Sequence, residues 1–172
     1  MVTHAVTKYR IQPFWDDGYQ SLEYITEPFN DPDSVALWTQ QGYTDRFTGA
    51  MCDMRSTQPA WNWQFIEFFA NQGWQDIGTS YYRMMPGTVQ PTHSDLYARY
   101  VKLYDLQGRE HTIRRAIVFL EAWQPGHYGE HLDQPFVLWQ AGDVVEWTYD
   151  TPHMAANCGS QPRYTLQITG HV

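Results

Sequence analysis

Two histidines and one aspartate in the C-terminal half of the sequence are suited to binding a metal ion. His93 and Asp95 form a His-x-Asp pair, and His153 follows after a long interval. Two imidazoles and one carboxylate can occupy one face of an Fe(II) ion and leave its other coordination positions open. Because side chains alternate between the faces of a strand, His93 and Asp95 would project to the same side of one. We therefore expect His93, Asp95 and His153 to form a catalytic iron site, with the second histidine supplied by a neighbouring strand.

A cationic residue lies ten positions beyond the second histidine, at the start of the last apolar stretch. If that stretch is a strand, Arg163, Thr165 and Gln167 share one face, and three apolar or aromatic residues share the other. Burying the polar face is costly unless it meets a polar ligand. A guanidinium beside a hydroxyl is well suited to a carboxylate. The pattern therefore indicates that Arg163 and Thr165 hold a short dicarboxylate near the metal.

Four further residues are candidates for the wall of the same pocket. We expect Tyr82 and Asn157 to contact the bound ligand, and Trp139 and Trp147 are also candidates for the wall. Large aromatic side chains are more often packed in a core than exposed to a ligand. A packing role therefore remains open for each of the four residues.

Two adjacent arginines precede the apolar stretch 116–120. On a strand, only one of Arg114 and Arg115 would point into the interior. That arginine would either bind a carboxylate of a ligand or form a salt bridge with an acidic neighbour. The sequence does not decide which of the two points inward.

A second group of possible ligands, His127, Glu130 and His131, follows Pro125-Gly126. We favour a solvated loop for this segment, because proline and glycine punctuate loops. If the three residues bind a metal, the site would be of the cupin type, although their spacing does not fit the usual cupin pattern. Near the mouth of a barrel they could instead contact substrate.

The elements that must position these residues have the spacing of a β-rich fold. From Ile77 onward, short stretches of apolar and β-branched residues are separated by turn residues about every ten positions. We expect strands at 80–85, 93–97, 101–104, 112–123, 136–139, 144–149, 153–157 and 163–169. Short strands with frequent turns predict a sandwich or a jelly roll, and not repeated strand–helix–strand units.

The N-terminal part has a different pattern, which predicts helices. We expect an irregular or edge-strand lead-in, a short helix at 35–41 and a longer helix at about 59–72. Trp61, Phe65, Phe68 and Phe69 lie on one side of the longer helix and should pack against a sheet. We therefore expect a single domain over residues 1–172, with 1–76 as helical or irregular support and 77–172 as the β core.

Composition narrows the possible partners. The formal net charge of −8 disfavours binding to nucleic acid, which needs a basic surface. We find no apolar run long enough to cross a bilayer and no secretion signal. Cys52 and Cys158 have no zinc-like spacing, so a reduced cytoplasmic protein is the simplest interpretation, although a disulfide between them remains open.

With these residues in this order, the sequence resembles the Fe(II)/2-oxoglutarate-dependent dioxygenases. The resemblance covers residues 81–170, and its motifs are 91–95 (Pro-Thr-His-Ser-Asp), 152–157 (Pro-His-Met-Ala-Ala-Asn) and 163–166 (Arg-Tyr-Thr-Leu). These motifs look most like small hydroxylases of the aspartyl/asparaginyl- or prolyl-hydroxylase-like kind, including compact phage-encoded members. The resemblance implies a mainly β fold, the double-stranded β-helix, which is a form of jelly roll. It also implies His93, Asp95 and His153 as iron ligands, and Arg163 with Thr165 as the site for 2-oxoglutarate.

The resemblance further implies Fe(II) as the cofactor and 2-oxoglutarate and O2 as cosubstrates. A C–H bond of an amino-acid, peptidyl or small-molecule substrate would be hydroxylated, with release of succinate and CO2. Two other functions remain open, a cupin-type isomerase or dioxygenase that uses His127, Glu130 and His131, and a non-catalytic jelly-roll module for a sugar or peptide. The N-terminal half carries no recognisable motif, so the sequence leaves the identity of the substrate open.

Overall fold

The protein is built mainly from antiparallel strands. The computed structural model describes residues 4–44, 46–52 and 58–172. Its strands are β1 (Val6–Arg10), β2 (Tyr24–Thr26), β3 (Ala50–Cys52), β4 (Gln75–Met84), β5 (Thr88–His93), β6 (Ile113–Phe119), β7 (His127–His131), β8 (Gln134–Phe136), β9 (Asp143–Thr148), β10 (His153–Asn157) and β11 (Arg163–His171). The α-helices are α1 (Pro32–Gln40), α2 (Asn62–Ala70) and α3 (Ala98–Leu103), and the 3₁₀ helices are η1 (Asp17–Ser21) and η2 (Glu110–Thr112).

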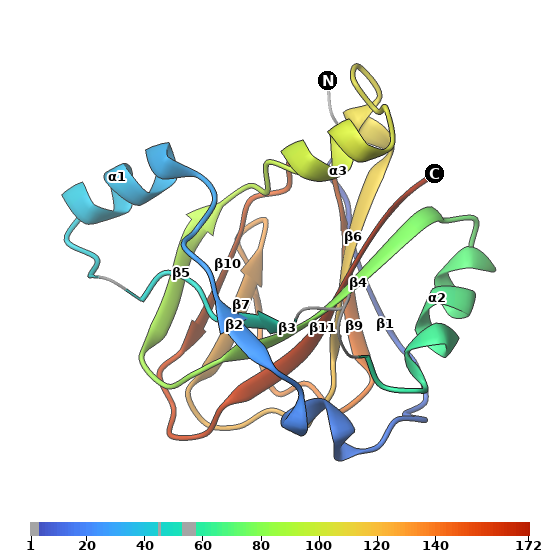
Figure 1. The fold of residues 1–172 in the computed structure, drawn as a ribbon. Coiled ribbons are helices and arrows are strands. Elements are labelled where there is room, and N and C mark those ends of the chain that lie inside the picture. Colours follow the sequence, from blue (N-terminus) through green and yellow to red (C-terminus); the bar gives the residue numbers. More distant parts are fainter. Residues whose placement is uncertain (1–3, 45, 53–57) are drawn as a thin grey trace.

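The strands form two antiparallel sheets (Figure 1). The larger sheet has seven strands in the order β1-β9-β6-β11-β4-β3-β2, and the smaller has four in the order β5-β10-β7-β8. Neighbouring strands within each sheet are mostly distant in sequence, which is typical of a jelly roll and not of a simple meander. The predicted two-sheet β fold is therefore confirmed.

Helix α2 covers the outer face of the larger sheet. Phe65 and Phe69 of this helix are fully buried among residues of β4, β6, β9 and β11. Asn62 and Ala70 are the ends of the helix, which is shorter than predicted, and Gly73 follows it with a φ of +88°. The aromatic stripe of α2 thus packs on a sheet, as its helical spacing predicted.

Strand β11 lies at the centre of the larger sheet and has two different faces. Leu166 and Ile168 are fully buried on the face that meets α2. Arg163 and Thr165 are also buried, on the opposite face, which is directed between the two sheets. The alternation predicted for this strand therefore holds, and it places a polar row inside the molecule.

A smaller apolar cluster lies between the sheets, formed by Phe119, Trp139, Val145 and Trp147. The rings of Phe119 and Trp139 are stacked, with centroids 4.1 Å apart. Phe119 and Trp147 of this cluster also line the cavity described below.

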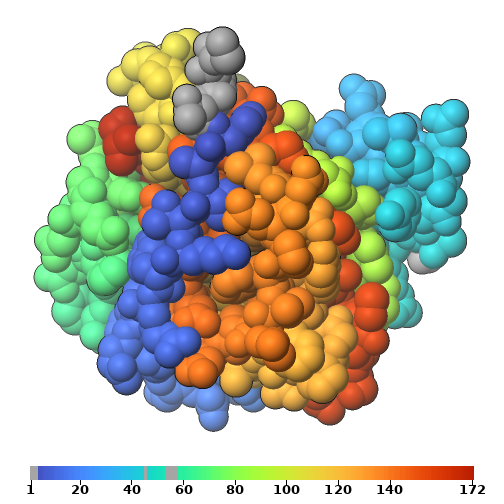
Figure 2. Space-filling view, turned by 180° about the vertical axis from the view of Figure 1, so that it is seen from behind, coloured from blue at the N-terminus to red at the C-terminus, as the bar shows by residue number. Residues whose placement is uncertain are grey.

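The N-terminal segment contributes strands as well as support. β1 pairs with β9 at one edge of the larger sheet, and β2 and β3 extend the other edge. Figure 2 shows the β1 segment (blue) running beside β9 (orange), with α1 (cyan) and α2 (green) on opposite sides. Among the residues that the structure describes, no helix combines the length and the apolar character needed to cross a bilayer.

Three predicted strands were wrong in type or in most of their extent. Of the strand predicted at 136–139, only Phe136 belongs to a strand, β8. Residues 101–104 belong largely to α3, in which the amide of Val101 donates to Tyr97 O. Strand β5 ends at His93, so Asp95 lies in the loop that follows it. Valine and tyrosine favour strands, but this segment connects the two sheets, and tertiary context overrides such local preferences.

Candidate metal centre

The two histidines of the expected metal site lie on adjacent strands of the smaller sheet. His93 ends β5, His153 begins β10, and the two are cross-strand partners. Asp95, two positions beyond β5, turns its carboxylate toward both rings. Its Oδ1 lies 3.9 Å from His93 Nε2, and its Oδ2 lies 3.9 Å from His153 Nε2. One ligand atom from each of the three residues falls within 4.8 Å of the others, so a single ion can be shared after small side-chain movements.

Backbone carbonyls orient both imidazoles. His93 Nδ1 lies 2.7 Å from Pro91 O, and His153 Nδ1 lies 2.9 Å from Thr151 O. A carbonyl oxygen only accepts hydrogen bonds, so each Nδ1 must carry the hydrogen. In the neutral rings the lone pair is therefore on Nε2, the atom that faces Asp95. This is the arrangement that metal-binding histidines usually have.

The charges of the three residues also fit a cation. Burial, with a contribution from His153, lowers the pKa of His93 to about 4, so the ring is neutral at pH 7. Burial acts to raise the pKa of Asp95, but Arg115 and the two histidines outweigh it and hold this pKa below its usual range. His93 Nε2 and Asp95 Oδ2 are buried without a hydrogen-bond partner, as expected for atoms that bind a metal ion.

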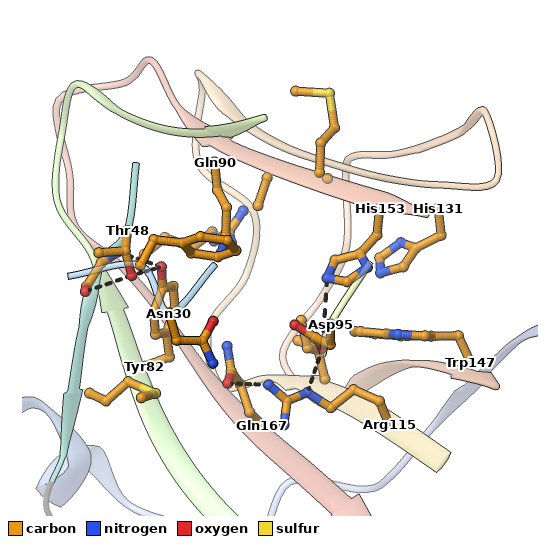
Figure 3. A pocket seen from close by; sticks show the side chains of 18 of the residues that line it. Asn30, Thr48, Tyr82, Gln90, Asp95, Arg115, His131, Trp147, His153 and Gln167 are labelled. Carbon is orange, nitrogen blue, oxygen red and sulfur yellow. Dashed lines mark hydrogen bonds and ion pairs between the residues drawn. The ribbon is translucent and has the colours of Figure 1, made fainter. Parts of the chain in front are cut away.

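Arg115 is the arginine of the pair that points inward. Its Nε lies 3.6 Å from Asp95 Oδ2, and its Nη2 donates to Gln167 Oε1 at 2.8 Å. Its Nη1 also donates to Thr169 Oγ1. Arg114 turns the other way and donates to backbone carbonyls near its own position. Arg115 therefore links the aspartate of the triad to the larger sheet (Figure 3).

A cavity of about 180 Å³ adjoins the triad. Its wall includes Asp95 and His153 at the metal end and Arg163 and Tyr82 elsewhere, with Gly129 between the sheets. A wider groove of about 560 Å³ shares Asp95 with it and extends along α3. The two spaces meet at the aspartate, so the metal site is accessible from both.

Arg163 brings a buried positive charge into this cavity. Its Nη1 donates to Tyr128 O at 2.8 Å, but its Nε has no hydrogen-bond partner. Thr165 Oγ1, on the same face of β11, is also buried without a partner. Burial lowers the pKa of Arg163 to about 10, so the guanidinium remains charged at neutral pH. An unpaired guanidinium nitrogen at a cavity wall, with an unpaired hydroxyl on the same face of β11, fits an anionic ligand.

Tyr82 and Asn157, both expected to contact the ligand, lie in different surroundings. Tyr82 is in the cavity wall, and its hydroxyl accepts a hydrogen bond from the amide of Gly49. Asn157 is fully buried outside that wall, and its Nδ2 donates to Met84 O and Gln161 O, both at 2.8 Å. Its amide therefore organises the backbone before β11, and the geometry provides no contact between Asn157 and the cavity.

The second group of possible ligands is not in a solvated loop, and this prediction was wrong. His127, Glu130 and His131 belong to β7, and both histidines are buried. Glu130 lies on the opposite face of the strand, where its carboxylate accepts a hydrogen bond from Tyr128 Oη. Within the described ranges, the three do not form a cluster able to hold a metal. Proline and glycine mark the turn before β7, and the inward alternation of 127, 129 and 131 was the signal that sequence reasoning missed.

Of the two tryptophans considered for the wall, Trp147 lines the cavity and Trp139 does not, although both belong to the cluster between the sheets. Trp147 lines the cavity, with its ring centroid 4.4 Å from that of His131 and 4.9 Å from that of His153. Trp139 packs in the cluster between the sheets, and the Arg163 guanidinium lies 5.9 Å from its ring centroid. Trp147 thus shields the metal end of the cavity, and Trp139 packs near its arginine end.

Comparisons with known proteins show the fold. No protein-family model and no curated protein matches the sequence. A prolyl-4-hydroxylase from Pseudomonas putida has a similar structure, with a TM-score of 0.57 at 15% identity, over 98% of this chain and 93% of that chain. A Klebsiella pneumoniae protein with a double-stranded β-helix domain matches 56% of this chain and 68% of its own at 13% identity and TM-score 0.38. A Photorhabdus luminescens protein, of which this chain spans 62%, matches 55% of this chain at 13% identity and TM-score 0.39. Together with the two antiparallel sheets, the full-length match confirms the double-stranded β-helix.

Proposed function

We propose that this protein is an Fe(II)- and 2-oxoglutarate-dependent oxygenase. It would hydroxylate a C–H bond of an amino-acid, peptidyl or small-molecule substrate and release succinate and CO2. The observation that supports this proposal most strongly is one cavity lined by both Asp95 and Arg163, each of which has a buried polar atom without a hydrogen-bond partner. His93 Nε2 and Asp95 Oδ2 make no hydrogen bond at the metal site, although Arg115 Nε lies 3.6 Å from that oxygen. On β11, Arg163 Nε and Thr165 Oγ1 make no hydrogen bond either. A metal ion with a dicarboxylic 2-oxo acid would satisfy both sets.

His93, Asp95 and His153 would hold the metal. Their two neutral imidazoles and one carboxylate match the ligand set that leaves several iron positions open. A ferrous ion bound there would supply the redox chemistry with dioxygen. The work of the protein is to keep both Nε2 atoms unprotonated, through the bonds to Pro91 O and Thr151 O, and to keep Asp95 ionised beside Arg115.

Arg163 and Thr165 would hold the far carboxylate of the cosubstrate. Arg163 is fixed at one nitrogen by Tyr128 O, so its free Nε has a defined direction. Because the Arg163 side chain is buried, a carboxylate there would form a strong charge-assisted hydrogen bond. Tyr82 lines the same space and would contact the ligand.

The wider groove is the place for the substrate. It meets the cavity at Asp95 and is lined on its outer side by α3 residues such as Tyr100 and Leu103. A substrate in this groove would approach the metal from the side of α3, and the cosubstrate would lie on the side of Arg163. The fold shared with the Pseudomonas putida prolyl-4-hydroxylase is compatible with this arrangement.

The test is release of succinate from 2-oxoglutarate by the purified protein with Fe(II) in air. Even without substrate, slow succinate release is expected. His93→Ala and His153→Ala should each reduce the rate of succinate release to below about 1% of wild type. Loss of a metal ligand should lower activity more than loss of a residue that only orients a ligand, which costs about 10- to 100-fold. Arg163→Met should chiefly raise the 2-oxoglutarate concentration required. His111→Gln, at an exposed histidine, is the matched control and should leave the rate unchanged.

Two outcomes would contradict this assignment. Normal turnover of 2-oxoglutarate in His93→Ala would exclude that residue as a ligand. A protein that binds no transition metal, and whose Tm does not change with Mn(II) and 2-oxoglutarate, would favour a non-catalytic binding module.

A further inference from the structure

His131 is a buried histidine whose ring nitrogens both lack a partner. It lies on β7, is 5% exposed and forms part of the cavity wall. Neither Nδ1 nor Nε2 makes a hydrogen bond within the protein. A buried polar group without a partner destabilises a protein, so such groups are rare unless a ligand completes them.

The surroundings of His131 leave only the edge of its ring free. The ring lies 5.7 Å from that of His153, its cross-strand partner, and is nearly parallel to it at 10°. Trp147 packs against it with centroids 4.4 Å apart. His131 is nevertheless not part of the group whose ligand atoms lie within 4.8 Å of one another. It is therefore next to the metal site without belonging to it (Figure 3).

Strand β7 connects the two ends of the cavity. Arg163 donates to the carbonyl of Tyr128, which fixes the arginine end near that position. His153 pairs with His131 at the metal end of the same strand. Gly129 lies between, faces the cavity and has no side chain to fill it. A ligand extended from Arg163 to the metal would pass Gly129 and end beside His131.

We infer that His131 donates a hydrogen bond to the metal-end carboxylate of the 2-oxo acid. This inference rests on the proposed function and assigns a second recognition residue to the same site. Arg163 would select the far carboxylate, and His131 would select the 2-oxo-acid end. A neutral imidazole suits this position, because it supplies an N–H donor without adding positive charge beside a metal ion.

The experiment measures binding to the Mn(II)-loaded protein by calorimetry, so that no turnover is needed. The ligands are 2-oxoglutarate and 2-oxobutyrate, which has the same 2-oxo-acid end but no far carboxylate. His131→Phe, which keeps a ring between Trp147 and His153, should weaken both ligands equally, by about tenfold or more. Arg163→Met should weaken 2-oxoglutarate alone. His131→Asn, which restores a donor and an acceptor, should recover part of the lost affinity.

Each alternative role of His131 gives a different result. Unchanged affinity of His131→Phe for both ligands would overturn the inference and point to a contact with the substrate. A loss of Mn(II) affinity without a further loss of 2-oxo-acid affinity would overturn it in favour of a metal ligand. If His131→Phe does not fold, His131→Leu takes its place and is judged by the same criteria. Failure of the wild type to bind 2-oxoglutarate while it binds Mn(II) would refute the proposed function itself.

Discussion

Each side chain of the triad is oriented by a residue outside the triad. His93 and His153 are oriented by carbonyls two positions earlier in the chain, and Asp95 is oriented by Arg115. Arg115 is itself held by Gln167 and Thr169 of β11. Such supporting contacts commonly change metal affinity by 10- to 100-fold.

Arg115→Met should weaken Mn(II) binding by about 10- to 100-fold, because Asp95 loses the cation that orients it and lowers its pKa. Metal titration by calorimetry at pH 7 measures this loss. Arg114→Met is the matched control, since Arg114 is adjacent in sequence but turns away from the cavity. Equal metal affinities for the two variants would show that Arg115 has no positioning role.

At the scale of elements, the alternation along β7 determines which of its residues face the cavity. His127, Gly129 and His131 face inward, but His127 Nε2 is bonded to Gln161 O and only the other two line the cavity. An added Cβ at Gly129 would meet nothing closer than Phe136 O at 3.9 Å, and the backbone there has no positive φ. A side chain at 129 would therefore be tolerated by the strand and would enter the cavity.

Gly129→Val should lower the affinity of the Mn(II)-loaded protein for 2-oxoglutarate by about 10- to 100-fold, because the valine side chain would occupy space that the ligand needs. Affinity for Mn(II) alone should remain near that of the wild type. The control is Glu130→Val, which places the same side chain on the opposite face of the same strand. Undiminished 2-oxoglutarate binding in Gly129→Val would show that the ligand does not pass position 129.

In the molecule as a whole, the main apolar cluster and the candidate metal site lie on opposite sides of the larger sheet. The main apolar cluster lies between that sheet and α2, and the buried histidines lie between the two sheets. Burial, with His153, Lys8 and Arg163, lowers the pKa of His131 to about 3. At a pH above about 6.5, the ordinary pKa of histidine, the His131 ring is neutral in both the folded and the unfolded state. At a lower pH, the unfolded chain binds a proton at His131 that the folded protein does not bind, so the free energy of unfolding decreases as the pH falls.

When the pH is lowered from 7 to 5, the free energy of unfolding should therefore decrease in both metal-free proteins. The decrease should be about 2 kcal/mol smaller for His131→Phe than for the wild type. Urea unfolding at the two pH values, with a chelator present, measures the difference. Burial raises the pKa of Glu121 and of Glu146, which has the opposite effect on pH dependence, but both carboxyls are present in both proteins. Identical losses in the two proteins would mean that His131 is protonated in the folded state at pH 5.

Much of this protein was determined by local sequence patterns. The two-residue period of β11 separated Arg163 and Thr165 from Leu166 and Ile168, and the helical period placed Phe65 and Phe69 on one face. Short strands between frequent turns were enough to predict a jelly roll, because both signals depend only on neighbouring residues. The His-x-Asp pair, the later histidine and the arginine were recognisable for the same reason, as residue types at characteristic intervals.

Only the tertiary structure decided which distant residues meet. The choice of Arg115 over Arg114, the exclusion of Asn157 from the cavity and the place of His131 beside His153 all depend on strand pairing and register. A shift of one residue in a strand reverses the face of every side chain on it, so these contacts cannot be inferred from intervals alone. The segment predicted as a loop at 127–131 is strand β7, and its place between β10 and β8 likewise depends on strand pairing.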